Sequence, residues 1–182
     1  MKSFFGILLI LITVYGANAQ KTSVECVRSV PVPILKKSVF PKKTFNLTKS
    51  KENPGEMIGY EKVKVNKGSD LTIVNAGCEN YTLTFQFLVK NQNRPTTDTK
   101  FWYKTAIELM NSIKKGIRSV DLDLINRGLR AVTTYLHKTK KPKFENYLEF
   151  GGTDIRDTVV LDKVSQQAGK HKVAISFSVG PL

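Results

Sequence analysis

The sequence predicts an α+β fold in which a mainly antiparallel sheet carries a two-helix antiparallel hairpin on one face. Three observations predict it: residues 81–90 alternate between apolar and polar, residues 99–138 hold two apolar stripes at helical spacing, and strand patterns return afterwards. The hairpin is therefore inserted between N-terminal and C-terminal strands. Because the helix pair is the only long crossover, a doubly wound fold of the Rossmann type is not expected.

The first 19 residues have the composition of an export signal. Lys2 gives a positive start, an apolar run follows, and Ala17 and Ala19 are small residues at the spacing that signal peptidase accepts. The apolar run is shorter than the roughly 20 residues that a membrane-spanning helix needs. We therefore expect residues 1–19 to be cleaved and the protein to be periplasmic or extracellular, with no integral membrane segment after cleavage.

Residues 20–55 form a proline- and lysine-rich arm that we expect to be partly irregular and to pack on a single α+β domain, residues 56–182. Within the arm, "VRSVPVPILKKSVF" (27–40) is compatible with extended chain against a sheet edge, where proline is tolerated. "LTKSKENPGE" (47–56) is interpreted as a loop, because turn-forming residues follow one another in it.

Three strands are expected next, at residues 57–65, 71–74 and 81–90. Residues 66–70 have turn chemistry, and residues 76–80 close a hairpin between the second and third of these strands. The third strand has the clearest pattern, because its period of two places aromatic and aliphatic side chains on one face. That face consists of Tyr81, Leu83, Phe85, Phe87 and Val89.

Two helices are expected at residues 99–115 and 120–138, the first capped by Asp98 or Thr97. Their short link makes them an antiparallel hairpin. Trp102 is compatible with either a core position or a surface contact. The two apolar stripes are Tyr103, Ala106, Met110, Ile113 and Ile117, then Leu122, Ile125, Leu129, Val132 and Leu136.

Strands return after Pro142, which prevents the second helix from continuing. They are expected at residues 146–150, 158–164 and 172–179, and "QQAGK" (166–170) has the composition of a hairpin turn. In the last strand Val173, Ile175, Phe177 and Val179 share one face.

The chain has two cysteines, Cys26 in the arm and Cys78 in the hairpin turn. In an exported protein two cysteines usually pair, so we predict a Cys26–Cys78 disulfide that ties the arm to the sheet. A nucleophilic Cys78 would instead need a nearby base to form the thiolate, and His137 and His171 are the only histidines.

The sequence lacks the motifs of the common catalytic and metal sites. Its histidines and cysteines have no metal-ligand spacing, and it contains neither a glycine-rich phosphate loop nor G-x-S-x-G. We therefore expect no metal, no cofactor and no catalytic residues. A small secreted hydrolase with an unrecognised site is the third alternative; the closest carboxylate pairs are Glu145 with Glu149 and Asp154 with Asp157.

The formal net charge is +14, and the excess of basic residues falls in the arm and in the helical hairpin. Such a charge favours anionic partners. Few aromatic residues lie between the basic ones, so nucleic acid is not an expected partner. The candidate binding residues form a basic face opposite the second apolar stripe: Arg127, Arg130, His137, Lys138, Lys140 and Lys141.

These observations indicate an exported, non-catalytic binding protein that recognises another macromolecule, either a protein or an anionic polymer. An inhibitor or immunity-type protein fits the size and the absence of catalytic motifs. The alternative is a polyanion-binding protein of the envelope or matrix that uses the basic helical face. Asn46 and Asn80 begin N-glycosylation triplets, which matter only in a eukaryotic secretory pathway.

Overall fold

The computed structural model describes residues 26, 28–65, 69–90, 92–151 and 155–180. The expected export signal, residues 1–19, lies outside the described residues. The same holds for residues 66–68 of the expected turn and for Asp154. None of the described helices is both long and apolar enough to cross a membrane.

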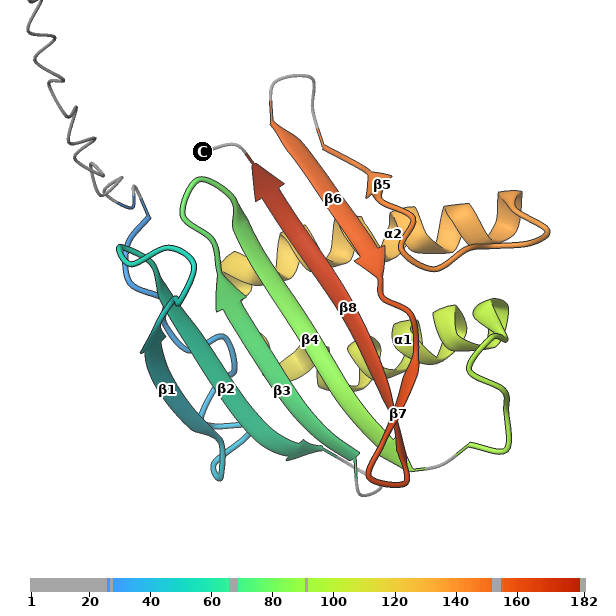
Figure 1. Cartoon of the computed structure of the whole chain (residues 1–182), viewed down its shortest axis with the longest axis horizontal. Coiled ribbons are helices and arrows are strands. Elements are labelled where there is room, and N and C mark those ends of the chain that lie inside the picture. Colours follow the sequence, from blue (N-terminus) through green and yellow to red (C-terminus); the bar gives the residue numbers. More distant parts are fainter. Residues whose placement is uncertain (1–25, 27, 66–68, 91, 152–154, 181–182) are drawn as a thin grey trace, which may run out of the picture.

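An eight-stranded antiparallel sheet forms one layer of the molecule (Figure 1). Its path runs β1-β2-β3-β4-β8-β6-β5, and β7 pairs with β8 beside this path. The last strand of the chain therefore lies in the middle of the sheet, next to β4. The strands are β1 Thr44–Lys49, β2 Met57–Val65, β3 Ser69–Ala76, β4 Tyr81–Lys90, β5 Leu148–Glu149, β6 Arg156–Leu161, β7 Ser165–Gln167 and β8 Lys170–Gly180.

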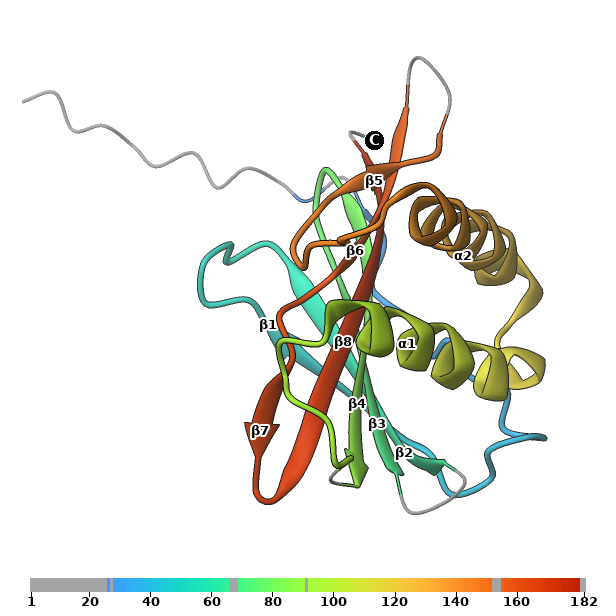
Figure 2. The ribbon, with the colours of Figure 1, turned by 90° about the vertical axis from the view of Figure 1, so that its right-hand side faces the viewer.

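Two helices form the second layer: α1, Thr99–Ile113, and α2, Ser119–Lys138, joined by the short 3₁₀ helix η2, Lys114–Gly116. They run antiparallel in Figure 1, and Figure 2 shows both on the same face of the sheet. Asp98 caps α1, since its Oδ1 accepts a hydrogen bond of 3.1 Å from the backbone N–H of Phe101. The predicted α+β class and the inserted helical hairpin are confirmed.

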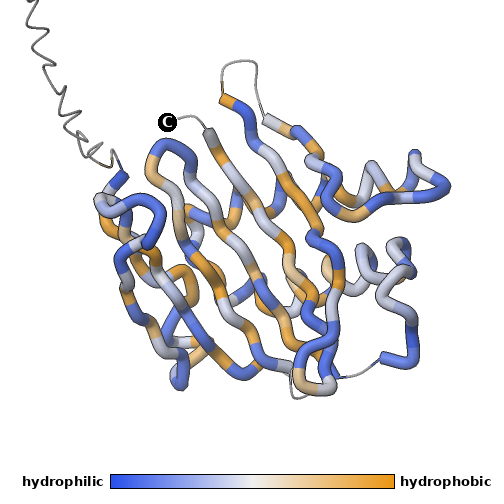
Figure 3. Tube along the Cα trace, viewed as in Figure 1, coloured by the Kyte–Doolittle hydropathy of each residue, from blue (hydrophilic) through white to orange (hydrophobic). Residues whose placement is uncertain are grey.

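The core lies between the sheet and the helices, and the period-two pattern fixes which strand residues enter it. Figure 3 shows apolar and polar residues alternating along the central strands. On β4, Leu83, Phe85 and Phe87 have no exposed surface. Trp102 is also fully buried, and its Nε1 donates to the carbonyl of Pro95 at 2.9 Å, so it is a core residue. The predicted β8 residues Val173, Ile175 and Phe177 are equally buried.

The N-terminal arm contains a strand that the sequence patterns do not indicate. β1 pairs with β2 in antiparallel register, with Leu47 opposite Gly59. The interpretation of residues 47–56 as a loop is therefore wrong for residues 47–49. The turn-rich composition of this segment belongs to residues 50–56, whereas the strand that precedes them is stabilised by pairing with the edge of β2.

Three strand boundaries near the turns also differ from the prediction. β3 begins at Ser69 and ends at Ala76, so it takes residues that we assigned to the flanking turns. β6 ends at Leu161, and a separate strand, β7, takes Gln166 and Gln167, which we assigned to the hairpin turn. That turn is confirmed, since Ala168 and Gly169 both have positive φ, 49° and 71°, as the favoured two-residue turn requires.

The arm is held in place by the carboxylate of Glu61, which is 2% exposed and lies on β2. It accepts hydrogen bonds from the backbone N–H groups of Ile34 (2.7 Å) and Leu35 (3.0 Å) and forms an ion pair with Lys43. Ile34 and Leu35 thereby enter the core, at 1% and 2% exposure.

The same stretch of the arm also contacts the link between the helices. The backbone N–H of Lys36 donates to the carbonyl of Gly116 at 2.7 Å, and that of Arg118 donates to the carbonyl of Ile34 at 3.0 Å. The arm therefore connects the sheet with the end of the helical hairpin that carries η2.

The predicted disulfide is present between Cys26 and Cys78, whose Cα atoms are 5.0 Å apart. Replacing both cysteines by serine is expected to lower the free energy of unfolding by about 2–4 kcal/mol, because the unfolded chain loses the closed loop of 52 residues. Urea unfolding would measure this loss. Reduction of the wild-type protein should give the same loss, and a change below about 1 kcal/mol in both experiments would contradict the prediction.

Candidate anion-binding site

Arg127, one of the predicted binding residues, is engaged within the protein. Its Nε donates to Asp123 at 2.8 Å, its Nη1 pairs with Asp157 on β6, and the guanidinium lies 5.5 Å from the ring centre of Phe150. The hydrogen bonds that Arg127 donates to Asp157 and then to Asp123 raise its pKa. Arg127 therefore joins α2 to the sheet, and its charge is already balanced by two carboxylates.

The other predicted residues of the basic face are exposed. Arg130 projects from the middle of α2, and His137 and Lys138 lie in its last turn. Lys140 and Lys141 follow in the loop after the helix, again exposed. Of these five residues, Arg130 lines the concave site described next.

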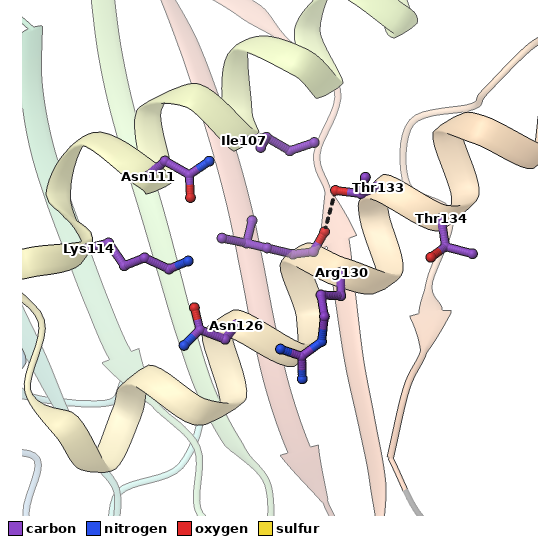
Figure 4. A pocket seen from close by; sticks show the side chains of 8 residues that line it. Ile107, Asn111, Lys114, Asn126, Arg130, Thr133 and Thr134 are labelled. Atoms are coloured by element: carbon purple, nitrogen blue, oxygen red, sulfur yellow. Dashed lines mark hydrogen bonds between the residues drawn. The ribbon is translucent and has the colours of Figure 1, made fainter.

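That site is a groove of about 380 Å³ between the two helices (Figure 4). Its floor is apolar, since the side chains of Ile107 and Leu129 contribute to it, and its rim is polar. The residues that line it are Ile107 and Asn111 of α1, Lys114 of η2, and Asn126, Leu129, Arg130, Thr133 and Thr134 of α2.

The groove forms because both helices place polar side chains beside their apolar stripes. Asn111 and Lys114 are three residues apart and lie one turn from each other on α1 and its continuation. Asn126 and Arg130 are four residues apart on α2 and line the other side of the groove. Sequence reasoning identified Arg130 but missed Lys114 and Asn126, which a search for polar residues bordering both stripes would have found.

The electrostatics of the groove favour an anion. Lys114 and Arg130 bring two cations to it, and none of its lining residues is acidic. In Figure 4 the side chains of Lys114 and Asn126 point toward one another from the two helices. The Oδ1 atom of Asn126 is buried and has no hydrogen-bond partner among the described residues, so it is an acceptor that a ligand could use.

The groups in the groove can bind a polar ligand. The lining residues supply ammonium, guanidinium, amide and hydroxyl groups, which hold and orient a polar ligand. They include no carboxylate, imidazole or thiol that could act as a general base or a nucleophile.

A second polar cluster lies near the disulfide and is structural. Arg28 of the arm donates to the side chain of Asn75 at 2.5 Å and lies 4.1 Å from the ring centre of Tyr81. The Tyr81 hydroxyl donates to Asp121 at 2.7 Å, and Arg118 donates to the same carboxylate at 3.3 Å. Burial lowers the pKa of Arg28 and raises that of Tyr81. This cluster joins the arm, β4 and the start of α2.

The candidate nucleophile, the buried histidine and the candidate carboxylates are held by structural contacts. Cys78 is in the disulfide, and His171 is fully buried against Trp102, with ring centres 4.7 Å apart. Asp157 is bound to Arg127, and the exposed Glu149 lies 3.8 Å from Arg156. Among the residues that the structure describes, no group of three or more acidic, histidine or cysteine side chains is arranged to hold a metal ion.

Comparison with known proteins yields no relative: no protein-family model, no curated protein and no solved structure matches this chain.

Proposed function

We propose that this protein is an exported, non-catalytic binding protein that recognises an anionic macromolecule through the exposed face of its helical layer. The observation that carries the proposal is the excess of unbalanced positive charge on that layer. Residues 99–143 contain eleven basic side chains, and two of them, Arg118 and Arg127, are in ion pairs. The remaining nine have no ion-pair partner among the described residues.

The carboxylates of the same segment do little to neutralise this charge. Asp121 and Asp123 are bound to Arg118 and Arg127, which leaves Glu108 as the free exposed acid between residues 99 and 143. A positively charged surface attracts polyanions over distances near the Debye length, which is about 8 Å at physiological salt. The disulfide supports a location outside the cytoplasm, because thiols pair stably in oxidising compartments.

Retention on immobilised heparin tests this function. We expect the wild-type protein to bind and to elute with a steep dependence on salt, because each contact with the polymer releases counterions. Changing Lys138, Lys140 and Lys141 to glutamine should lower the slope of log affinity against log salt by up to about two.

A matched control removes the same charge from the sheet, by changing the exposed residues Lys49, Lys62 and Lys64 to glutamine. This variant should keep a slope close to that of the wild type. Equal losses of slope in the two triple variants would mean that binding depends only on the net charge of the protein. Elution of the wild type at low salt would rule out the proposed function.

A second candidate is recognition of another protein, in the manner of an inhibitor. Tyr147, in the loop between α2 and β5, is 71% exposed, and exposed tyrosines are frequent anchors at protein interfaces. Tyr147 follows, along the chain, the lysines at the end of α2, and an acidic protein would complement their charge.

A further inference from the structure

We infer that the groove between α1 and α2 binds an acidic sugar, that is, a sugar unit with a carboxylate or sulfate group beside free hydroxyls. This inference rests on the proposed function, since it names the class of anionic macromolecule and the place where one unit of it is held. It differs from a diffuse electrostatic contact because the groove has a defined set of donors and acceptors.

The anionic group is attracted by two cations from different elements. Lys114 comes from η2 and Arg130 from α2, and the groove that they border contains no acid. Guanidinium and ammonium groups form short, charge-assisted hydrogen bonds with carboxylates and sulfates. The exposed Lys140 and Lys141, in contrast, are not among the residues that line this groove.

The free hydroxyls of a sugar are favoured by two acceptors to which an anion cannot donate. Asn126 Oδ1 is buried without a hydrogen-bond donor, and the Thr133 hydroxyl already donates to the carbonyl of Leu129 at 2.8 Å, so its oxygen can only accept. A simple anion has no hydrogen to give to either oxygen. A sugar hydroxyl does, and the Lys114 side chain, with its four-carbon stem, can move aside to admit it.

The shape and lining of the groove also fit one sugar ring better than a nucleotide base. Its volume, about 380 Å³, is at the small end of ligand pockets, and Ile107 and Leu129 give it an aliphatic floor for the C–H face of a ring. None of the lining residues is aromatic, so a base would have no platform on which to stack.

Titration calorimetry with short polymers tests the inference. The probes are a sulfated heparin oligosaccharide, an oligogalacturonate and an oligothymidylate of matched charge. The groove variant changes Lys114 and Arg130 to glutamine; its control changes the exposed Lys104 and Lys115, which removes the same charge outside the groove. A third variant, Asn126→Leu, removes the acceptor without changing the charge.

We expect at least one acidic oligosaccharide to bind, and the better one identifies the preferred anionic group. The groove variant should lose about tenfold in affinity for it and the control less than about threefold. Asn126→Leu should weaken sugar binding without changing its salt dependence. Circular dichroism melting curves should show that all variants fold.

Two results would overturn the inference while leaving the proposed function intact. One is an equal loss of affinity in the groove and control variants. The other is oligothymidylate binding as tight as that of the sugars and equally weakened by Asn126→Leu. Failure of the wild-type protein to bind any of the three polyanions would instead overturn the proposed function itself.

Discussion

Replacing Glu61 by alanine is expected to lower the free energy of unfolding by about 3–5 kcal/mol. The side chain is 2% exposed, and its carboxylate is the acceptor for two backbone N–H groups and the partner of Lys43. Its removal leaves the N–H groups of Ile34 and Leu35 buried without acceptors and leaves the Lys43 ammonium without its counter-charge. Each of these groups then carries its full desolvation cost.

Chemical denaturation measures the loss, and hydrogen exchange locates it. In Glu61→Ala the amides of Ile34 and Leu35 should exchange faster, while those of β4 should change only as global stability does. Glu61→Gln keeps one acceptor and should lose less. Glu79→Ala, which removes an exposed carboxylate, should be close to neutral. A loss below about 1 kcal/mol in Glu61→Ala would show that the arm is held by other contacts.

Replacing Phe177 by alanine is expected to cost about 3–5 kcal/mol, as large-to-small changes of buried aromatic residues do. The ring is fully buried between the sheet and α2, and it meets the ring of Phe85 edge-on, with centres 5.9 Å apart. The half-buried Phe101 offers a comparison, and its replacement by alanine should cost less. A cost for Phe177→Ala below that of Phe101→Ala would contradict the described packing.

The contact of Phe177 with Gly128 allows a second test of this packing. A Cβ atom at Gly128 would lie 2.6 Å from Cδ1 of Phe177, so α2 approaches the sheet closely only because this position lacks a side chain. Gly128→Ala alone should cost about 1–3 kcal/mol, although alanine favours helices. In the double variant, Gly128→Ala with Phe177→Ala, the new methyl group occupies space that the lost ring leaves. The combined loss should therefore be smaller than the sum of the single losses.

The stability of the arm bears on the candidate site because the arm contacts the end of the helical hairpin. The bond from Lys36 to Gly116 and the bond from Arg118 to Ile34 hold the two ends of the link between the helices. Lys114 lies within this link and lines the groove. The buried residues Ile34 and Leu35 therefore support the position of a groove to which their own side chains do not contribute.

Much of the fold follows from side-chain periodicity. The alternation in residues 81–90 predicts the bounds of β4 and its buried face, because successive side chains of a strand point to opposite sides. The three- and four-residue steps identify the buried residues of α1, among them Tyr103 and Met110, for the analogous helical reason. The pairing of Cys26 with Cys78 follows from their number and the expected compartment.

The candidate site is predicted less completely. The charge of the hairpin and the exposed position of Arg130 follow from the sequence, because they depend on the spacing within a single helix. The ion pair between Arg127 and Asp157 does not follow from the sequence, since these residues are 30 positions apart and belong to different elements. The same is true of the groove, which requires Lys114 and Asn126 to face one another across two helices.

The sequence by itself determined the type of most elements, the faces that they bury and the excess of positive charge on the helical hairpin. The tertiary structure decided which strands are neighbours, how β1 pairs, where Glu61 holds the arm, and which basic residues border a groove. The physical reason is the distance along the sequence over which each kind of interaction acts. Periodicity and capping act within a few residues, whereas the pairing of β4 with β8 joins Thr82 to Ser178, 96 residues away. Such contacts form only when the whole core is assembled.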